Sequence, residues 1–135
     1  MRRVAILLCM LGSLLMISAC SIQKISTEKI RDLDFTVVKE EDVPDELMNM
    51  IEEQKLKTMK LTFEDQGMLY IVEGYGAQAT SGYSIEVAEC FETENAIYFR
   101  SNLLGPSKSE TIVEEATYPY IVVKLESIDK NVVFQ

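Results

Sequence analysis

The chain has 135 residues, with 22 Asp and Glu against 13 Lys and Arg, a formal net charge of −9 and no histidine. This length is that of one domain. The missing imidazole excludes Ser-His-Asp and Cys-His catalytic sites and nearly every common zinc site, and the acidic balance argues against nucleic-acid binding, which needs clustered Lys and Arg.

The N-terminal residues have the pattern of a bacterial lipoprotein signal. Arg2 and Arg3 precede an apolar run of 14 residues at positions 4–17, which is shorter than the roughly 20 residues that a membrane-spanning helix needs. Residues Ile17 to Cys20 then resemble the lipobox of bacterial lipoproteins, in which the cysteine is acylated and becomes the mature N-terminus. We therefore expect residues 1–19 to be a lipoprotein signal peptide and Cys20 to be the lipidation site. An ordinary secretory signal is the alternative.

Processing at this site would leave a mature chain of 116 residues with a formal charge of −11, because Arg2 and Arg3 leave with the signal. An anionic membrane surface repels such a charge, so lipid on Cys20, at about 0.8 kcal/mol per buried methylene, has to supply the anchoring. Cys9 also leaves with the signal, so Cys90 is the one free thiol that remains and no intramolecular disulfide forms. We expect Cys90 to be a small buried residue; a reactive thiol or an intermolecular bridge is the alternative.

The mature chain divides into a short tether and one domain. Residues 20–31 are polar and lack a hydrophobic rhythm, so we expect a flexible tether there and a folded domain at 32–135. Leu33, Phe35 and Val37 alternate with the residues between them, which predicts a half-buried strand. The acidic residues 40–42 end this pattern. They lack the alternating ligands and the central glycine of a calcium loop, so we expect a solvated helix entry and no metal site.

The pattern over residues 44–56 predicts one helix. Pro44 stands where the first turn begins, and Asp45 and Glu46 suit the positive end of the helix dipole. Glu53 and Lys57 are four residues apart, with the acid first, and are expected to pair. A stripe at helical spacing is expected to pack against a sheet. It consists of Leu47, Met48, Met50, Ile51 and Gln54.

After the helix the hydrophobic period changes to two and predicts strands. These are 59–64 and 68–75, joined as a hairpin by a turn at 65–67, then 83–91, 96–104, 118–126 and a short edge strand at 131–134. The predicted fold is mainly β: an antiparallel β-sandwich or partly open barrel with one N-terminal α-helix. One face of the 83–91 strand should carry Tyr83, Ile85, Val87 and Phe91.

The segment 74–84 has the composition of a recognition loop. Its glycines bend the chain, and its tyrosine, threonine, serine and glutamine side chains offer aromatic surface and hydrogen bonds. The alternative is an ordinary β-connection in which Gly82 takes a positive φ. The candidate partner-binding residues in this segment are Gln78, Thr80, Ser81, Gly82 and Tyr83.

Tyr118 and Tyr120 complete the candidate partner-binding set as a rim near that loop. Pro119 between them also has a structural explanation, because a proline at the start of a strand ends pairing and blunts a sheet edge. A phosphate loop, a nucleophile elbow and a complete dinucleotide loop are all missing from the sequence. We therefore expect neither a catalytic site nor a cofactor.

Several of these segments together resemble the PrcB family, the protease complex subunit PrcB. They are 70–76, the corner at 80–84, Leu104-Gly105-Pro106 and, above all, 117–125 with its Tyr-Pro-Tyr strand entry. The likeness covers about residues 68–126, and Ser81 stands where a glycine is more usual. The family is named for a lipoprotein that accompanies and stabilises a surface protease, so the resemblance implies a non-catalytic partner role.

Residues Gln78 to Tyr83 are also similar to the Asn-Pro-Thr-Thr-Gly-Tyr loop of chagasin-type cysteine protease inhibitors, although Gln78 and Ala79 differ at the first two positions. We expect a non-enzymatic lipoprotein, held on the extracytoplasmic face of the cell membrane by acylated Cys20. Its β domain is expected to bind and stabilise a protein partner such as a protease or its precursor. A cysteine-protease-inhibitor-like domain and a small-ligand or glycan-binding module are the alternatives.

Overall fold

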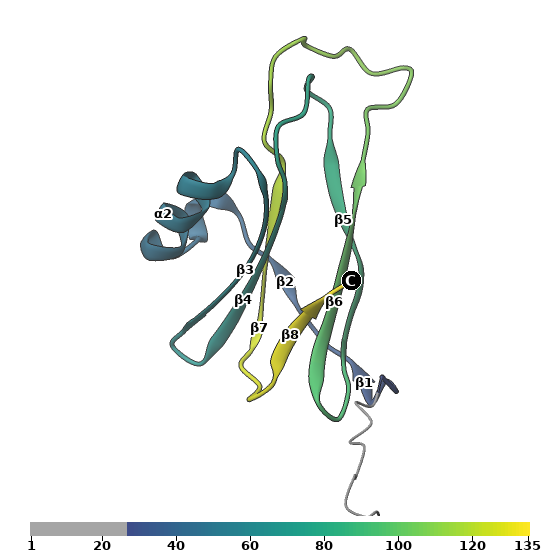
Figure 1. The fold of residues 1–135 in the computed structure, drawn as a ribbon. Coiled ribbons are helices and arrows are strands. Elements are labelled where there is room, and N and C mark those ends of the chain that lie inside the picture. Colours follow the sequence, from purple (N-terminus) through teal and green to yellow (C-terminus); the bar gives the residue numbers. More distant parts are fainter. Residues whose placement is uncertain (1–26) are drawn as a thin grey trace, which may run out of the picture.

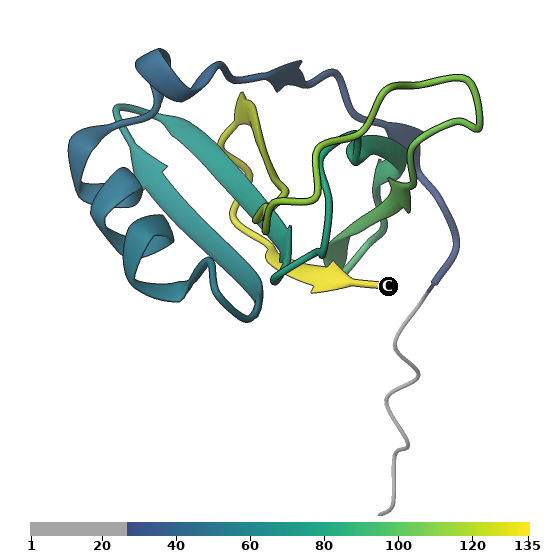
Figure 2. The ribbon, with the colours of Figure 1, turned by 90° about the horizontal axis from the view of Figure 1, so that it is seen from above.

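The computed structural model describes residues 27–135, which form two four-stranded β-sheets packed face to face with one helix on the outside (Figures 1 and 2). The expectations for residues 1–19 and Cys20 concern positions outside this described part. Neighbouring strands are antiparallel, except that β8 lies parallel to β6. The predicted β-sandwich with an N-terminal helix is therefore confirmed, whereas the sheets do not close into a barrel.

The two sheets take their strands from both halves of the chain. The first sheet is β1 (Arg31–Asp32), β5 (Ser84–Glu92), β6 (Ala96–Leu104) and β8 (Asn131–Phe134), in that order. The second sheet is β2 (Thr36–Val37), β7 (Tyr120–Glu126), β4 (Met68–Tyr75) and β3 (Thr58–Asp65). The β3–β4 hairpin turns at Gln66 and Gly67, which both have positive φ, as the Asp-Gln-Gly turn predicted.

The helix α2 (Asp45–Gln54) follows a short 3-10 turn, η2 (Glu40–Asp42), and covers the outer face of the second sheet. Leu47 and Ile51 are completely buried, which stabilises the fold by about 2 kcal/mol for each side chain. Gln54 is exposed, so it does not belong to the buried stripe. The expected pair of Glu53 with Lys57 is wrong. The helix ends at Gln54, which leaves Lys57 outside helical spacing, and Lys55 pairs with Glu52 at 2.7 Å instead.

The second sheet has one hydrophobic core on each of its faces. The inter-sheet core consists of Leu33, Leu69, Ile71, Cys90, Ile97, Phe99, Ile121, Val123 and Leu125. The helix core, between this sheet and α2, consists of Val43, Leu47, Ile51, Met59, Tyr70, Val72 and Val122. Cys90 is buried as expected, and burial raises the pKa of its thiol to about 11.

The segment predicted as one half-buried strand at 33–38 instead crosses from one sheet to the other. β1 pairs with β5 in the first sheet, and β2 pairs with β7 in the second. Leu33 points into the inter-sheet core, but Phe35 is 38% exposed and Val37 is 56% exposed. The prediction for Phe35 and Val37 was therefore wrong, because a crossing segment with two-residue strands has no continuous inner face.

Phe91 also lies on the face opposite to the predicted one. The register of β5 against β6 shifts between Val87 and Glu89, so β5 contains a bulge. Ile85 and Val87 face the inter-sheet core before this bulge, and Cys90 takes that direction after it. Phe91 consequently turns outward and stacks on Tyr98, with ring centroids 5.3 Å apart.

Candidate partner-binding site

Two loops form one end of the sandwich, and the N-terminal side of the described chain lies at the other end (Figure 1). They are residues 76–83, between β4 and β5, and residues 105–119, between β6 and β7. We call them the distal loops. The strands β5 and β6 each have nine residues, so about 30 Å separates the two ends of the sandwich.

Glycines set the shape of the first distal loop. Gly76 has φ of 72°, and a Cβ there would lie 3.2 Å from the backbone of Lys57 and Thr58. Gly82 has φ of 93°, and a Cβ there would lie 2.7 Å from the Cβ of Pro106. The positive φ expected for Gly82 in an ordinary β-connection is thus present, and the backbone at Gly82 passes so close to Pro106 that a side chain would clash.

Hydrogen bonds join the distal loops into one unit. Gln78 and Thr117 exchange backbone hydrogen bonds, with nitrogen-to-oxygen distances of 2.8 and 3.0 Å. The Thr117 hydroxyl also donates to the carbonyl of Thr80 at 2.8 Å. Ser81 donates its N–H to the carbonyl of Val113 at 3.0 Å, and the Ser81 Oγ accepts the N–H of Val113 at 2.9 Å.

The polar groups of the candidate residues in the first loop are therefore mostly used in hydrogen bonds within and between the two loops. The hydroxyl of Thr80 donates to the carbonyl of Ser81 at 3.0 Å, and Ser81 is bonded to Val113 as described. Tyr83 is half-buried, and its ring lies 3.8 Å from where a Cβ on Gly105 would be. This loop leaves Ala79 and Gly82 exposed among its tip residues.

The second distal loop carries exposed apolar side chains that the sequence reasoning missed. Ile112 is 42% exposed and Val113 is 56% exposed. The available signal was an apolar pair between Thr111 and Glu114 that continues neither a strand nor a helix pattern. Such side chains at the end of the sandwich are candidates for contact with another protein.

Tyr118 and Tyr120 lie beside α2, so the structure does not bring their rings together with the tip of the first distal loop. Tyr120 packs in the helix core, and its hydroxyl donates to Sδ of Met48 at 3.9 Å. The Nζ of Lys55 lies 5.9 Å from the ring centroid of Tyr118. The connection to the first loop runs through the backbone, where Thr117 pairs with Gln78.

Comparison with known families decides where this segment belongs. Residues 69–126, from β4 through both distal loops to β7, match the model described as PrcB C-terminal. This segment belongs to the PrcB C-terminal family. The family expected from the sequence is thereby confirmed, and the match includes every candidate partner-binding residue named above. Searches of curated proteins and of solved structures found no match.

The PrcB C-terminal segment contains two buried glutamates, Glu73 and Glu92, with 6% and 8% of their surfaces exposed. Glu92 pairs with Arg31 at 2.8 Å and with Lys130 at 2.7 Å, whereas Glu73 has no ion pair within the described residues. The Glu73 side chain stands between the sheets near the hydroxyls of Tyr75 and Ser101, which lie 2.6 Å from each other. Within residues 27–135, the Oε2 of Glu73 is buried without a hydrogen-bond partner. Burial raises the pKa of Glu73, and nearby Ser101, Lys60 and Tyr75 oppose the rise.

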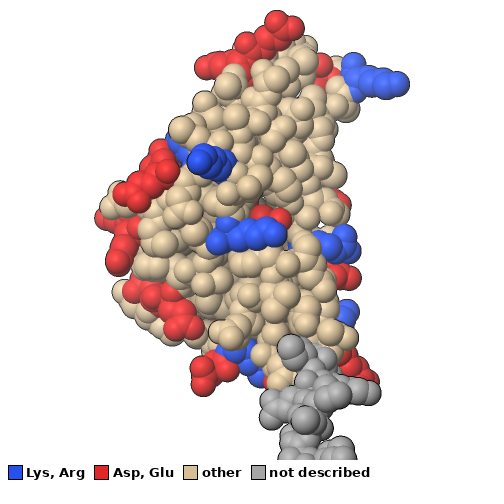
Figure 3. Space-filling view, in the orientation of Figure 1, with Lys and Arg blue, Asp and Glu red and all other residues tan. Residues whose placement is uncertain are grey.

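Acidic side chains gather over α2 and over the end that carries the distal loops (Figure 3). In the second loop of the PrcB C-terminal segment, Glu110, Glu114 and Glu115 are exposed around Ile112 and Val113. An apolar centre with a charged rim is the usual composition of a protein interface. The acidic rim favours a partner surface with basic residues.

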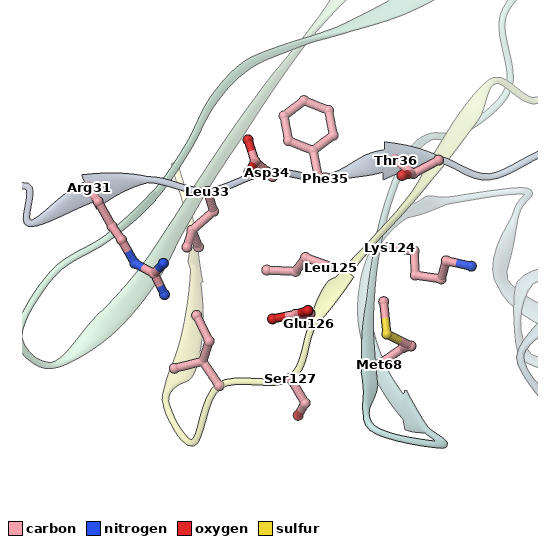
Figure 4. Close-up of a pocket in the computed structure, with 11 residues that line it drawn as sticks. Arg31, Leu33, Asp34, Phe35, Thr36, Met68, Lys124, Leu125, Glu126 and Ser127 are labelled. Atoms are coloured by element: carbon pink, nitrogen blue, oxygen red, sulfur yellow. The ribbon is translucent and has the colours of Figure 1, made fainter.

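A pocket of about 460 Å³ lies beneath the crossing from β1 to β2, far from the distal loops (Figure 4). Leu33 points from the crossing into it and Phe35 points away. Its charged lining residues have both signs: Arg31, Asp34, Lys124 and Glu126. This mixture selects no one class of ligand.

Within residues 27–135, no group of three or more potential metal-ligating side chains lies together, and η2 keeps Glu40, Glu41 and Asp42 exposed. No helix in the same part has both the length and the apolar character needed to cross a membrane.

Proposed function

We propose that this protein is a non-enzymatic lipoprotein, anchored by acylated Cys20 on the extracytoplasmic face of the cell membrane, that binds and stabilises a protein partner. The partner is a protease or its precursor, and it binds at the distal loops. The PrcB C-terminal family membership of residues 69–126 supports a role beside a protease. The lipobox at 17–20 supports the anchor.

The observation that carries this proposal is that the start of the described chain and the distal loops lie at opposite ends of the sandwich. The described chain starts at one end, and both distal loops stand at the other (Figure 1). A lipid on Cys20 would therefore attach the domain at the end opposite to the distal loops. The loops would then face away from the bilayer, where a secreted partner can reach them.

The distal loops also have the physical character of a binding surface. Five hydrogen bonds join them, so little conformational freedom remains to be lost when a partner binds. Ile112 and Val113 supply exposed apolar area in the second loop. Burying it against a partner would contribute roughly 25 cal/mol for each Å² removed from water.

A photo-crosslinking amino acid at Val113 tests this proposal in the native host. Its side chain is exposed, and the hydrogen bonds of Val113 to Ser81 use the backbone, so the substitution leaves them in place. The matched control carries the same amino acid at exposed Asp129, in the turn between β7 and β8. We expect one crosslinked protease or protease precursor from Val113 and none from Asp129. Equal products from both positions, or none from Val113, would contradict the proposal.

A further inference from the structure

The strand β7 has an open edge at its start. On one side β7 pairs with β4 over its whole length, from Tyr120 to Glu126. On the other side β2 pairs only at Val123 and Lys124, and Val38 adds one bond by donating to the carbonyl of Val122 at 2.8 Å. After Val38 the chain turns away into η2. Among the backbone hydrogen bonds that residues 27–135 make outside the strand ladders, none involves Tyr118 or Tyr120.

The direction of the backbone groups shows that Pro119 does not close this edge. The carbonyl of Pro119 accepts the N–H of Tyr75 at 3.1 Å, and Thr117 exchanges both backbone bonds with Gln78. Because the N–H and C=O of alternate residues in an extended strand point to opposite sides, Thr117 and Pro119 face β4 and its continuation. Tyr118 and Tyr120 face the open side. The N–H that proline lacks is thus missing from the paired side, and the expected blunting of the edge was wrong.

A groove of about 330 Å³ runs along the open edge. Its lining includes exposed Val37, from β2, and half-buried Tyr118 and Tyr120, at the start of β7. An extended peptide presents alternate side chains to such a groove while its backbone pairs with the edge. Tyr118 and Tyr120 together offer two N–H donors and two carbonyl acceptors for that pairing.

The acidic charge around the groove favours an occupant with basic side chains. Among residues 27–135, Glu40 is the one charged residue that lines the groove. The hollow beside it is lined by Glu40, Glu41 and Glu52 together with Lys39, and Glu52 pairs with Lys55, so Glu40 and Glu41 give this side its acidic excess (Figure 3). Burial raises the pKa of the Tyr120 hydroxyl; the charges of Glu40 and Glu52 raise it further, and the charge of Lys55 opposes the rise. A basic side chain is attracted to this position, whereas a second copy of this chain, with its formal charge of −9, is repelled.

We propose that the open edge of β7 at Tyr118–Tyr120 binds an extended segment of the partner that contains Lys or Arg, by addition of a strand to the second sheet. This inference rests on the proposed function, since it gives the partner a second point of attachment beside the distal loops. The backbone pairing supplies affinity that is independent of sequence. Contact with Glu40 and with the apolar walls selects a basic, apolar-alternating segment.

Binding of defined peptides to the detergent-extracted full chain tests this inference. The probe is an octapeptide of alternating Val and Lys, and its controls are the same peptide with alternate amides N-methylated and an octapeptide of alternating Val and Glu. Labelling with ¹⁵N-tyrosine gives six amide signals, among which Tyr70 and Tyr98, in the interiors of β4 and β6, serve as internal references. We expect the Val-Lys peptide to slow hydrogen exchange at Tyr118 and Tyr120 roughly tenfold, and we expect neither control peptide to do so.

Two charge-changing variants measure how much Glu40 contributes to peptide binding. Glu40→Lys should weaken binding of the Val-Lys peptide by roughly tenfold, whereas Asp129→Lys, the same charge change at an exposed turn, should leave it unchanged. The inference is overturned by absence of binding at millimolar peptide, by equal binding of the Val-Glu peptide, or by binding without protection of Tyr118 and Tyr120. Protection of both amides in the chain alone at high concentration, without peptide, would show a second copy as the occupant and would equally overturn it.

The in-host crosslinks separate this inference from the proposed function. A photo-crosslinking amino acid at Val37, on the wall of the groove, should capture the same protease as the one at Val113. Capture from Val113 but not from Val37 refutes the strand addition alone. Failure at Val113 refutes the proposed function itself.

Discussion

The side-chain amide of Gln78 donates a hydrogen bond to the backbone carbonyl of Tyr75 at 3.2 Å. Tyr75 donates its own N–H to the carbonyl of Pro119 across the β4–β7 ladder. Proline has no N–H to return, so the Tyr75 carbonyl would lack its ladder partner. Gln78 supplies the missing donor from its side chain and thereby lets the ladder continue into the distal loops.

Gln78→Ala should lower the free energy of unfolding by about 1 kcal/mol, because the half-buried Tyr75 carbonyl loses its donor. Urea unfolding followed by tyrosine fluorescence measures the change. Gln135→Ala, at an exposed C-terminal glutamine, is the matched control and should have little effect. In the Gln78→Ala background, Pro119→Ala should restore part of the loss by providing an N–H opposite Tyr75. Additive effects of the two substitutions would contradict this role of Gln78.

Gly82→Ala should lower the free energy of unfolding by roughly 1–3 kcal/mol. Its φ of 93° disfavours a side chain, and the added Cβ would stand 2.7 Å from the Cβ of Pro106. Gly105→Ala is the matched control, because a Cβ there would come no closer than 3.8 Å to Tyr83. Thermal unfolding should separate the two variants by several degrees. Equal midpoints would show that the close approach of the two distal loops does not constrain position 82.

Glu73→Gln should raise stability at pH 7 by about 1 kcal/mol, because a buried charge with an unpaired oxygen becomes a neutral amide. The pKa of Glu73 is raised in the folded protein, so its favourable contribution is complete below the ordinary carboxyl pKa and is lost as pH rises through the raised value. The advantage of the variant should therefore vanish as pH falls below about 4.5. Denaturant midpoints across this range measure it.

The exposed pair of Glu86 with Asn102 provides the control for Glu73. Glu86→Gln keeps the acceptor for the Asn102 amide and should change stability by less than about 0.5 kcal/mol. A Glu73→Gln variant that is no more stable than the parent chain at pH 7 would contradict the account of a buried, under-bonded carboxylate.

Cys20→Ala should abolish incorporation of labelled fatty acid and leave an unprocessed precursor, because the lipid is attached to the thiol of this residue. Cys9→Ala removes a cysteine from the predicted signal peptide and should leave labelling intact. Gel mobility and metabolic labelling with palmitate in the native host give both readouts. Continued labelling of Cys20→Ala would refute the lipid anchor.

The elements that depend on local pattern could be predicted from the sequence. The helical spacing of Leu47 and Ile51 placed α2 within two residues of its ends, and Asp65 to Gly67 placed the β3–β4 turn. The bulge in β5 could not be predicted, because no glycine or proline marks Ala88 as the extra residue. The crossing at Phe35 was missed because alternation alone does not say which sheet a residue joins.

The candidate site was predicted in part for similar reasons. Glycine and polar residues indicated the first distal loop, but the hydrogen bonds of the Ser81 hydroxyl and of the Thr80 carbonyl are made with the second loop, more than 30 residues later in the chain. The edge at Tyr118 and Tyr120 is open because the backbone groups of Pro119 face β4. The sequence does not show this orientation, because it depends on the pairing of β7 with β4.

The most direct test of the central claim measures whether the distal loops hold and stabilise a partner. An affinity-tagged chain is extracted from the native host with and without Ile112→Ser and Val113→Ser, which remove apolar area from exposed positions. The parent chain should co-purify with a protease or its precursor. The double variant should reach the membrane in equal amount but should not co-purify with the protease, and the lifetime of the protease in the host should be shorter. Unchanged co-purification and lifetime with the double variant would contradict the claim that the distal loops bind the partner.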